Sequence, residues 1–157
     1  MRDTDQKIIK FAHEENLRDS DFFVSVSNKH VYDFLNRWPK WENNLINICG
    51  ENFSGKSHLV NIFIKKFKGI ILNADNFENE NLMNLDFYKN IFLENLDKKN
   101  NDKLIYSLIN TVEQNNKFLI VTTIKPISEI DFDLIDLKSR AKNFLIQNIN
   151  KPDDELI

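Results

Sequence analysis

The sequence predicts an α/β fold, a five-stranded parallel sheet flanked by helices. Short apolar runs alternate along the chain with segments of helical periodicity, and this order is typical of a parallel sheet covered on both faces. A glycine-containing stretch joins the first such run to the helix that follows it. The length of 157 residues is sufficient for one domain with a hydrophobic core. We expect a flexible tail over residues 1–20 and a folded core over residues 21–157.

The first helix follows the tail. Ser27 or Asn28 can cap it, because short polar side chains accept hydrogen bonds from the first turn of a helix. Its apolar positions have helical spacing, and Pro39 ends it because proline cannot continue a helix. These positions are Val31, Phe34, Leu35 and Trp38.

Strands and helices alternate over the rest of the chain. We expect strands at 44–49, 69–73, 90–95, 117–123 and 143–149, and helices at about 56–67 and 102–114. A polar connection, residues 74–89, joins the second strand to the third.

Composition excludes several classes of protein. The formal net charge is -3 and the pI is near 5.6, so no strongly basic field favours general binding of nucleic acid. Cys49 is the one cysteine, and an internal disulfide is impossible. The N-terminus is too charged for a signal peptide, and no apolar run reaches the roughly 18 residues of a membrane helix. We expect a cytoplasmic protein without a membrane partner.

The stretch GENFSGKS matches the phosphate-loop pattern G-x-x-x-x-G-K-[ST] in full. Its glycines let backbone N–H groups surround phosphates, and the following helix points its positive end at them. Lys56 reaches the outer phosphates, while the Ser57 hydroxyl can bind Mg²⁺. The alternative is a glycine turn that only joins strand to helix. The predicted nucleotide contacts are Gly50, Glu51, Asn52, Phe53, Ser54, Gly55, Lys56, Ser57 and His58.

The strand ends supply the second half of the predicted site. Glu94 can hold Mg²⁺ through a water molecule, or it is a solvated strand end. Asn95 follows where a second acid is common, and an amide has no usable basicity. Asp97 lies two residues further on, where it either points elsewhere or takes the place of the second acid. Thr122 closes the next strand, where its hydroxyl could reach the γ-phosphate. Nucleotide binding is therefore expected, with hydrolysis weak or absent.

Arg140 is the one arginine after Ser57. Small-molecule kinases neutralise the transferred phosphate with several arginines, which argues against that class. A single arginine at the domain edge can instead act in trans on the nucleotide of a neighbouring protein. The alternative is a surface arginine in an ordinary ion pair.

In order along the chain, several stretches resemble the AAA+ family, and specifically the Hda type of the branch related to the replication initiator DnaA. They are DFFVSVSNKHVYDFLNRWPKW, GENFSGKSHLVNIF, LIYSLINTVEQNNKFLIVTT, DLKSR and KPDDELI. The histidine of the second stretch, His58, is typical of this branch.

The resemblance implies a regulator of replication initiation that binds ADP or ATP with Mg²⁺. Such proteins contact the DNA polymerase sliding clamp through an N-terminal peptide and promote ATP hydrolysis by DnaA. Gln6, Ile9 and Phe11 match the clamp peptide, although this segment could instead pack on its own domain. Arg140 matches the arginine finger, and residues 23–28 match the segment beside the adenine.

Two departures from the family limit these expectations. Glu94-Asn95 replaces the usual acidic pair, which suggests a nucleotide that marks a state and is not consumed. The sequence ends at Ile157, before the family's helical lid, so we expect weakened nucleotide affinity. A DNA-reading helix-turn-helix is also missing, and sequence-specific DNA binding is not expected. Three alternatives remain open. The chain could form a homodimer, it could be an autonomous P-loop ATPase or kinase, or it could be an adaptor for another replication or chromosome-positioning partner.

Overall fold

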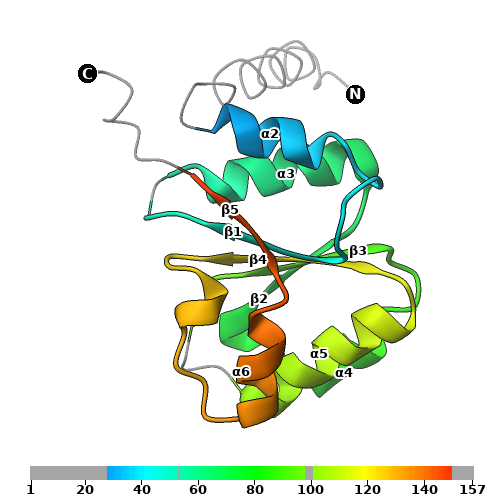
Figure 1. Cartoon of the computed structure of the whole chain (residues 1–157). Coiled ribbons are helices and arrows are strands. Elements are labelled where there is room, and N and C mark those ends of the chain that lie inside the picture. The colour runs from blue at the N-terminus through cyan, green and yellow to red at the C-terminus, as the bar shows by residue number, and fades with distance from the viewer. Residues whose placement is uncertain (1–27, 53, 98–100, 150–157) are drawn as a thin grey trace.

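The computed structural model describes residues 28–52, 54–97 and 101–149. Helices and strands alternate along these residues, as expected (Figure 1). The elements are, in chain order, α2 (Lys29–Leu35), β1 (Leu45–Cys49), α3 (Lys56–Phe67), β2 (Ile70–Asn73), η1 (Ala74–Asn76), α4 (Asn79–Met83), β3 (Asn90–Glu94), α5 (Asp102–Gln114), β4 (Phe118–Thr123), η2 (Ile127–Glu129), α6 (Ile135–Ala141) and β5 (Leu145–Asn148).

The strands form one five-stranded parallel sheet in the order β2-β3-β4-β1-β5. Every residue of β1 and of β4 is buried, as befits central strands covered on both faces. Cys49 is in register with Thr123, and Leu93 with Val121. The segments that leave β1, β3 and β4 therefore meet at the carboxyl edge of the sheet. The fold class predicted from the sequence is confirmed.

Helices cover both faces of the sheet: α2 and α3 lie on one, and α4, α5 and α6 lie on the other (Figure 1). The side of α5 and α6 is mainly aliphatic. The side of α2 and α3 holds a cluster of aromatic rings, with neighbouring centroids between 5.0 and 6.1 Å apart. Its members are Phe34, Trp38, Trp41, Phe63, Phe67, Phe92 and Phe118. This packing fixes α3 on the sheet and thus the loop before it.

The first helix is shorter than its apolar spacing predicts. It ends at Leu35, so Trp38 lies beyond it in a turn. The side-chain amide of Asn36 donates to the carbonyl oxygen of Tyr32 at 3.0 Å, a local bond that competes with continuation of the helix. Asn28 is the residue before the helix, but its side chain makes no capping hydrogen bond.

Two short helices lie where the sequence analysis placed none. The polar connection contains α4, which buries no residue, and α6 precedes the last strand. In α6 Leu137 and Ala141 are buried whereas Ile135 is 75% exposed, so the pattern of apolar residues is misleading there. Among the described residues, no helix has the length and apolar character needed to cross a membrane.

Candidate functional site

Local geometry explains both glycines of the loop between β1 and α3. The N–H of Gly50 donates to the carbonyl oxygen of Thr123 at 3.1 Å, so the loop starts at the edge of β4. A Cβ atom on Gly50 would lie 2.8 Å from the hydroxyl oxygen of Ser54. Gly55 has a φ of 100°, a left-handed conformation that favours glycine. The loop is thus a tight turn that places Lys56 at the start of α3.

The ammonium group of Lys56 faces the inside of the loop. It donates to the carbonyl oxygen of Gly50 and, at 3.0 Å, to that of Glu51. Burial lowers the pKa of Lys56, and the neighbouring Cys49 acts in the opposite direction. A phosphate beside Lys56 would favour its charged form, because an anion offsets the cost of burying the cation.

The hydroxyl of Ser54 is a second polar group of the loop that could bind a phosphate oxygen. Its oxygen is buried and has no hydrogen-bond partner among the described residues. Buried polar atoms in folded proteins nearly always have such a partner. The first turn of α3 carries no acidic residue, and a helix N-terminus attracts anions. The residues of this loop therefore fit a phosphate group.

Two strand ends lie beside the loop. Glu94 ends β3 and is half-buried, and this burial raises the pKa of its carboxyl group. Asn95 follows with a φ of 64°, and its backbone N–H donates to the hydroxyl oxygen of Thr122 at 3.1 Å. Asparagine is one of the few residues that adopts this left-handed conformation readily. The turn itself therefore gives a reason for an amide at position 95.

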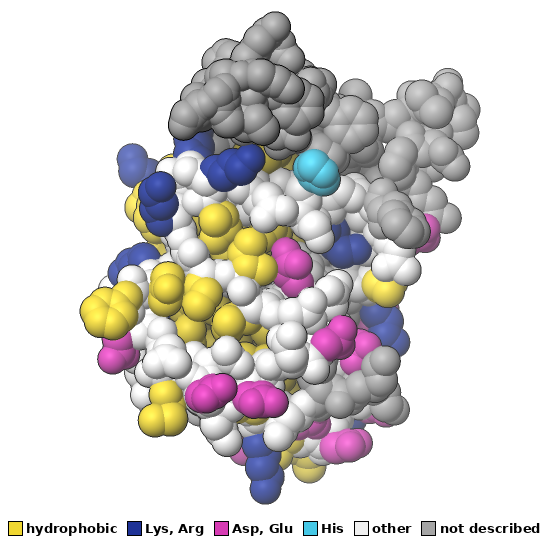
Figure 2. All heavy atoms as spheres, turned by 180° about the vertical axis from the view of Figure 1, so that it is seen from behind, with side chains coloured by type: hydrophobic (Ala, Val, Ile, Leu, Met, Phe, Trp, Pro, Cys, Tyr) yellow, Lys and Arg dark blue, Asp and Glu magenta, His cyan; other side chains and the backbone are white. Residues whose placement is uncertain are grey.

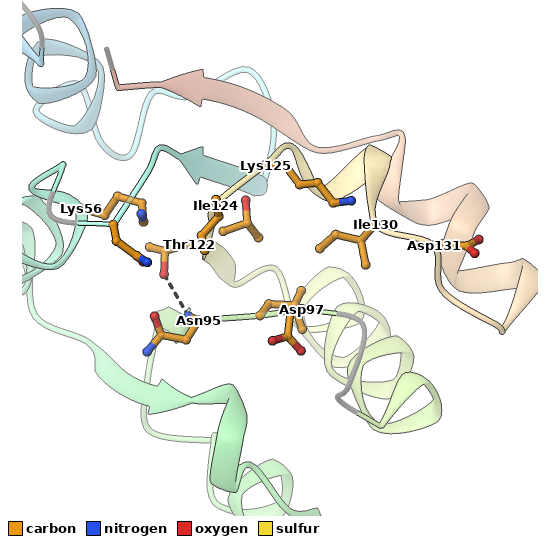
Figure 3. A pocket seen from close by; sticks show the side chains of 11 residues that line it. Lys56, Asn95, Asp97, Thr122, Ile124, Lys125, Ile130 and Asp131 are labelled. Atoms are coloured by element: carbon orange, nitrogen blue, oxygen red, sulfur yellow. Dashed lines mark hydrogen bonds between the residues drawn. The ribbon is translucent and has the colours of Figure 1, made fainter. Parts of the chain in front are cut away.

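The loop and the strand ends border a cavity of about 530 Å³ (Figure 3). Figure 3 shows Lys56 on one side of it, Asn95 and Thr122 near the middle, and Lys125 and Asp131 beyond them. The other lining residues are Asn52, Leu96, Asp97, Thr123, Ile124 and Ile130. Away from the phosphate loop the lining is thus mixed, with the apolar Ile124 and Ile130 next to the charged Lys125 and Asp131.

Part of the predicted site borders this cavity. Asn52, Lys56 and Thr122 line it, whereas Glu94 does not. Phe53 lies outside the described residues, and the other predicted loop residues, Gly50, Glu51, Ser54, Gly55, Ser57 and His58, are not among the lining residues. No sequence motif pointed to Ile124, Lys125, Ile130 and Asp131, which line the cavity after β4. The rule that ligands bind beyond the carboxyl ends of parallel strands would have drawn attention to this segment, which follows β4.

The donors predicted for Mg²⁺ are the exposed Ser57 hydroxyl and the half-buried Glu94 carboxylate. Over residues 28–52, 54–97 and 101–149, no group of three or more His, Cys, Asp and Glu side chains is placed to hold a metal ion. Mg²⁺ commonly binds through one or two protein oxygens together with substrate phosphates and water. Neither Ser57 nor Glu94 lines the cavity, so a magnesium ion held by these two donors stays a prediction.

Arg140 lies on α6 and makes its contacts with α5. Its guanidinium group pairs with the carboxylate of Glu113, donates to the side-chain oxygen of Asn110 at 2.8 Å, and lies 5.6 Å from the ring centroid of Tyr106. Arg140 does not line the cavity, and its role as an arginine finger stays a prediction. The ion pair also fits the alternative of a structural arginine.

The predicted clamp peptide, Gln6, Ile9 and Phe11, lies outside the described residues. The same holds for residues 23–27 of the expected adenine segment, whereas Asn28 is buried at the start of α2.

Comparisons with known proteins identify the fold. No protein-family model matches the sequence, and neither does any curated protein sequence. Solved structures do match. AMPPCP-bound DnaA from Aquifex aeolicus has a TM-score of 0.70 and 19% identity, over 88% of this chain and 52% of that one. Domain III of the replication initiation protein DnaA from Thermotoga maritima has a TM-score of 0.66 and 14% identity, over 87% of this chain and 68% of that one.

A third structure is closer to this chain in length. It is a protein from Streptococcus pyogenes serotype M3 that is provisionally assigned as a primosome component, with a TM-score of 0.62 and 11% identity over 81% of each chain. By contrast, the chain spans about half the length of the Aquifex DnaA structure. The five-stranded parallel sheet with its flanking helices is the fold of the AAA+ domain of DnaA.

Proposed function

We propose that this chain is a nucleotide-binding AAA+ module that regulates replication initiation, contacts the sliding clamp and promotes ATP hydrolysis by DnaA. The single observation that carries the nucleotide part is the phosphate loop. Lys56 faces its inside, and the buried Ser54 hydroxyl lacks a partner among the described residues. The ligand is ADP or ATP with Mg²⁺, and the AMPPCP-bound DnaA of the same fold supports an adenine nucleotide.

The strand end beside the loop supports a regulatory role and argues against turnover by the chain itself. Hydrolysis needs a group that accepts a proton from water, and the amide of Asn95 cannot do so. Glu94 keeps a carboxylate for a metal-bound water, so binding and turnover are separable here.

Arg140 is the residue that we assign to the action on DnaA. Its guanidinium group is held on α5 by Glu113 and Asn110, and its side chain is 22% exposed. Such a cation reaches another protein's nucleotide only if it exchanges these partners for phosphate oxygens. The charge-assisted bonds to phosphate are strong enough to compete with a partly solvated carboxylate.

The decisive experiment measures ATP hydrolysis by the cognate DnaA, in the presence of DNA-loaded sliding clamp, with and without the full chain. We expect stimulation that is lost in Arg140→Ala, by about 10³-fold or more if the arginine acts as a finger. Arg37→Ala is the matched control, because Arg37 is an exposed arginine whose carboxylate partner, Glu42, is 3.9 Å away. A folded Arg140→Ala protein that stimulates DnaA as well as the wild type would show that the assignment is wrong.

Clamp contact needs a test of its own. Gln6→Ala combined with Phe11→Ala should abolish binding to the clamp while nucleotide binding stays unchanged. In a short peptide, two anchoring side chains such as Gln6 and Phe11 supply most of the binding free energy. Unchanged clamp affinity in this double variant would remove the clamp from the proposal.

A second candidate is an adaptor for another replication partner, such as a helicase loader. The similarity to the Streptococcus protein, which covers the same share of both chains, favours this alternative. Lack of stimulation by a folded sample that binds nucleotide would support the adaptor. Steady ATP turnover by the isolated chain would instead support an autonomous ATPase.

A further inference from the structure

A second hollow lies at the far end of α3 from the phosphate loop. Its volume is about 580 Å³, and it is lined by the last residues of α3, the two residues between α3 and β2, and the three residues just before β3. Ile64 and Phe67 of α3 form an apolar, half-buried floor together with Tyr88. The resemblance to known proteins assigns no role to this groove.

The groove has a rigid frame. The side-chain amide of Asn90 donates to the carbonyl oxygens of Lys68 at 2.9 Å and of Phe67 at 3.5 Å, which ties the end of α3 to β3. Gly69 fits between them because a Cβ there would lie 2.6 Å from the carbonyl oxygen of Asn90. A preformed frame loses little conformational freedom when a ligand binds.

The rim of the groove is cationic although the chain as a whole is acidic. Lys65, Lys68 and Lys89 line it, no acidic residue does, and the formal net charge of the chain is -3. Lys89 donates to a neutral group, the carbonyl oxygen of Asn116, at 2.6 Å, and its charge therefore has no carboxylate partner in that bond. Figure 2 shows Lys and Arg side chains gathered next to apolar side chains on the left of this face.

Phe87 stands at the edge of the same groove with 94% of its surface exposed. Large aromatic side chains dominate the energetics of interfaces, and an almost fully exposed phenylalanine next to a hollow is unusual in a surface that binds nothing. The groove therefore combines an apolar floor, an exposed aromatic ring and a ring of lysines.

We propose that this groove binds a short acidic segment of a partner protein that carries apolar side chains. Carboxylates of the segment meet the three lysines, and an apolar side chain covers the floor beside Phe87. A single-stranded nucleic acid is the other anion that combines charge with flat rings. The observations favour the peptide, because the net negative charge of the chain repels a long polyanion.

The test uses the full chain labelled with ¹⁵N and three probes: the blocked octapeptide EDLFEELE, its charge-reversed counterpart KKLFKKLK, and the oligonucleotide (dT)₈. We expect the acidic peptide to shift the backbone amide signals of Lys65, Lys68, Phe87 and Lys89 with a Kd of about 1 mM or tighter. Binding should weaken severalfold when ionic strength rises from ~0.1 M to ~1 M, because salt screens exposed charges.

Variants then locate the site. Phe87→Ala with Lys68→Glu should weaken peptide binding at least about tenfold, by loss of the ring and reversal of one charge. Met83→Ala with Lys103→Glu is the matched control, since both residues are exposed and neither lines the groove. Its affinity should stay within about twofold of the wild type. Melting temperatures establish that both variants are folded. The signal shifts of the wild type locate the site independently of either variant.

Three results would overturn the proposal. The first is the absence of shifts at the groove with the acidic peptide. The second is that the charge-reversed peptide binds as tightly as the acidic one, or that the groove variant binds the acidic peptide as tightly as the control variant does. The third is tighter binding of (dT)₈ at the same amides, which would make the groove a nucleic-acid site.

Discussion

The two ends of α3 present the same charge in two different ways. At the N-terminal end, Lys56 is half-buried and its ammonium group is fixed by two carbonyl oxygens of the loop. At the C-terminal end, roughly 18 Å away at 1.5 Å per residue, Lys65 and Lys68 are exposed on long side chains. A buried and fixed cation selects a small anion of one shape, whereas exposed cations on long side chains suit an acidic partner that lies on the surface.

The helix dipole reinforces this difference. It adds positive potential at the N-terminal end, where no acidic residue occupies the first turn. At the C-terminal end its negative potential is balanced by Lys65 and Lys66 in the last turn. Lys65 of the groove thus also stabilises the helix, and the N-terminal end is the one at which the helix dipole attracts an anion.

The largest expected effect is the loss of nucleotide binding in Lys56→Ala. Removal of the fixed ammonium group should weaken ADP binding by about 2–5 kcal/mol, because a charge-assisted contact in a partly buried site is lost. Thermal unfolding with ADP up to millimolar concentration measures this. The wild type should melt at a higher temperature with ADP, by linkage, and the variant should not.

Lys68→Ala is the matched control, because it removes an ammonium group at the other end of the same helix. Its ADP-dependent shift should equal that of the wild type. An equal loss in both variants would mean that ADP is attracted by the general charge of α3 and that the loop is not its site.

Two glycines allow a second, intermediate comparison. Gly69→Ala places a Cβ 2.6 Å from a backbone oxygen of Asn90, which can move only with the sheet. Gly50→Ala places one 2.8 Å from the Ser54 hydroxyl oxygen, the end of a side chain that can rotate. We expect Gly69→Ala to lower the free energy of unfolding by about 1–3 kcal/mol and Gly50→Ala by less.

Urea unfolding without nucleotide measures both changes, with the slopes compared to establish that the same surface is exposed. For ADP binding the order should reverse, since Gly50 belongs to the loop and Gly69 does not. If Gly50→Ala is the more destabilising of the two, the Ser54 side chain cannot rotate away from the new Cβ atom, although its hydroxyl has no hydrogen bond among the described residues that would hold it.

Sequence reasoning succeeded for elements whose pattern is dictated by burial. The helix at α3 and the strand at β4 have strong apolar periodicity or a continuous apolar run, and both occur where expected. It failed at α6, whose first residue, Ile135, is exposed, and at the end of α2, where the local bond from Asn36 decides. Such bonds depend on side-chain geometry that the order of residues does not reveal.

In the candidate site, too, some residues could be predicted from the sequence and others could not. Lys56 follows from a motif in which each position has a chemical role. The structure places its ammonium group against two carbonyl oxygens of the loop, and its contact with a phosphate stays a prediction. The cavity wall formed by Ile124, Ile130 and Asp131 depends on how the segment after β4 folds back, and no residue pattern marks it. The groove beside Phe87 likewise joins α3 to residues some twenty positions later in the sequence.

The smallest expected effect tests the buried hydroxyl directly. Ser54→Ala removes a polar atom that has no partner among the described residues, so without nucleotide the variant should be as stable as the wild type or up to about 1 kcal/mol more stable. With ADP the sign should reverse, and the nucleotide-dependent gain should fall by about 0.5–1.5 kcal/mol because the phosphate loses one hydrogen bond. Asn90→Ala at the other end of α3 gives the contrast, since its Oδ1 also lacks a partner but its amide nitrogen donates to Phe67 and Lys68. That variant should be less stable in both conditions, and urea unfolding with and without ADP separates the two patterns. A Ser54→Ala protein that is destabilised equally with and without ADP would mean that the hydroxyl supports the loop itself and does not await a phosphate.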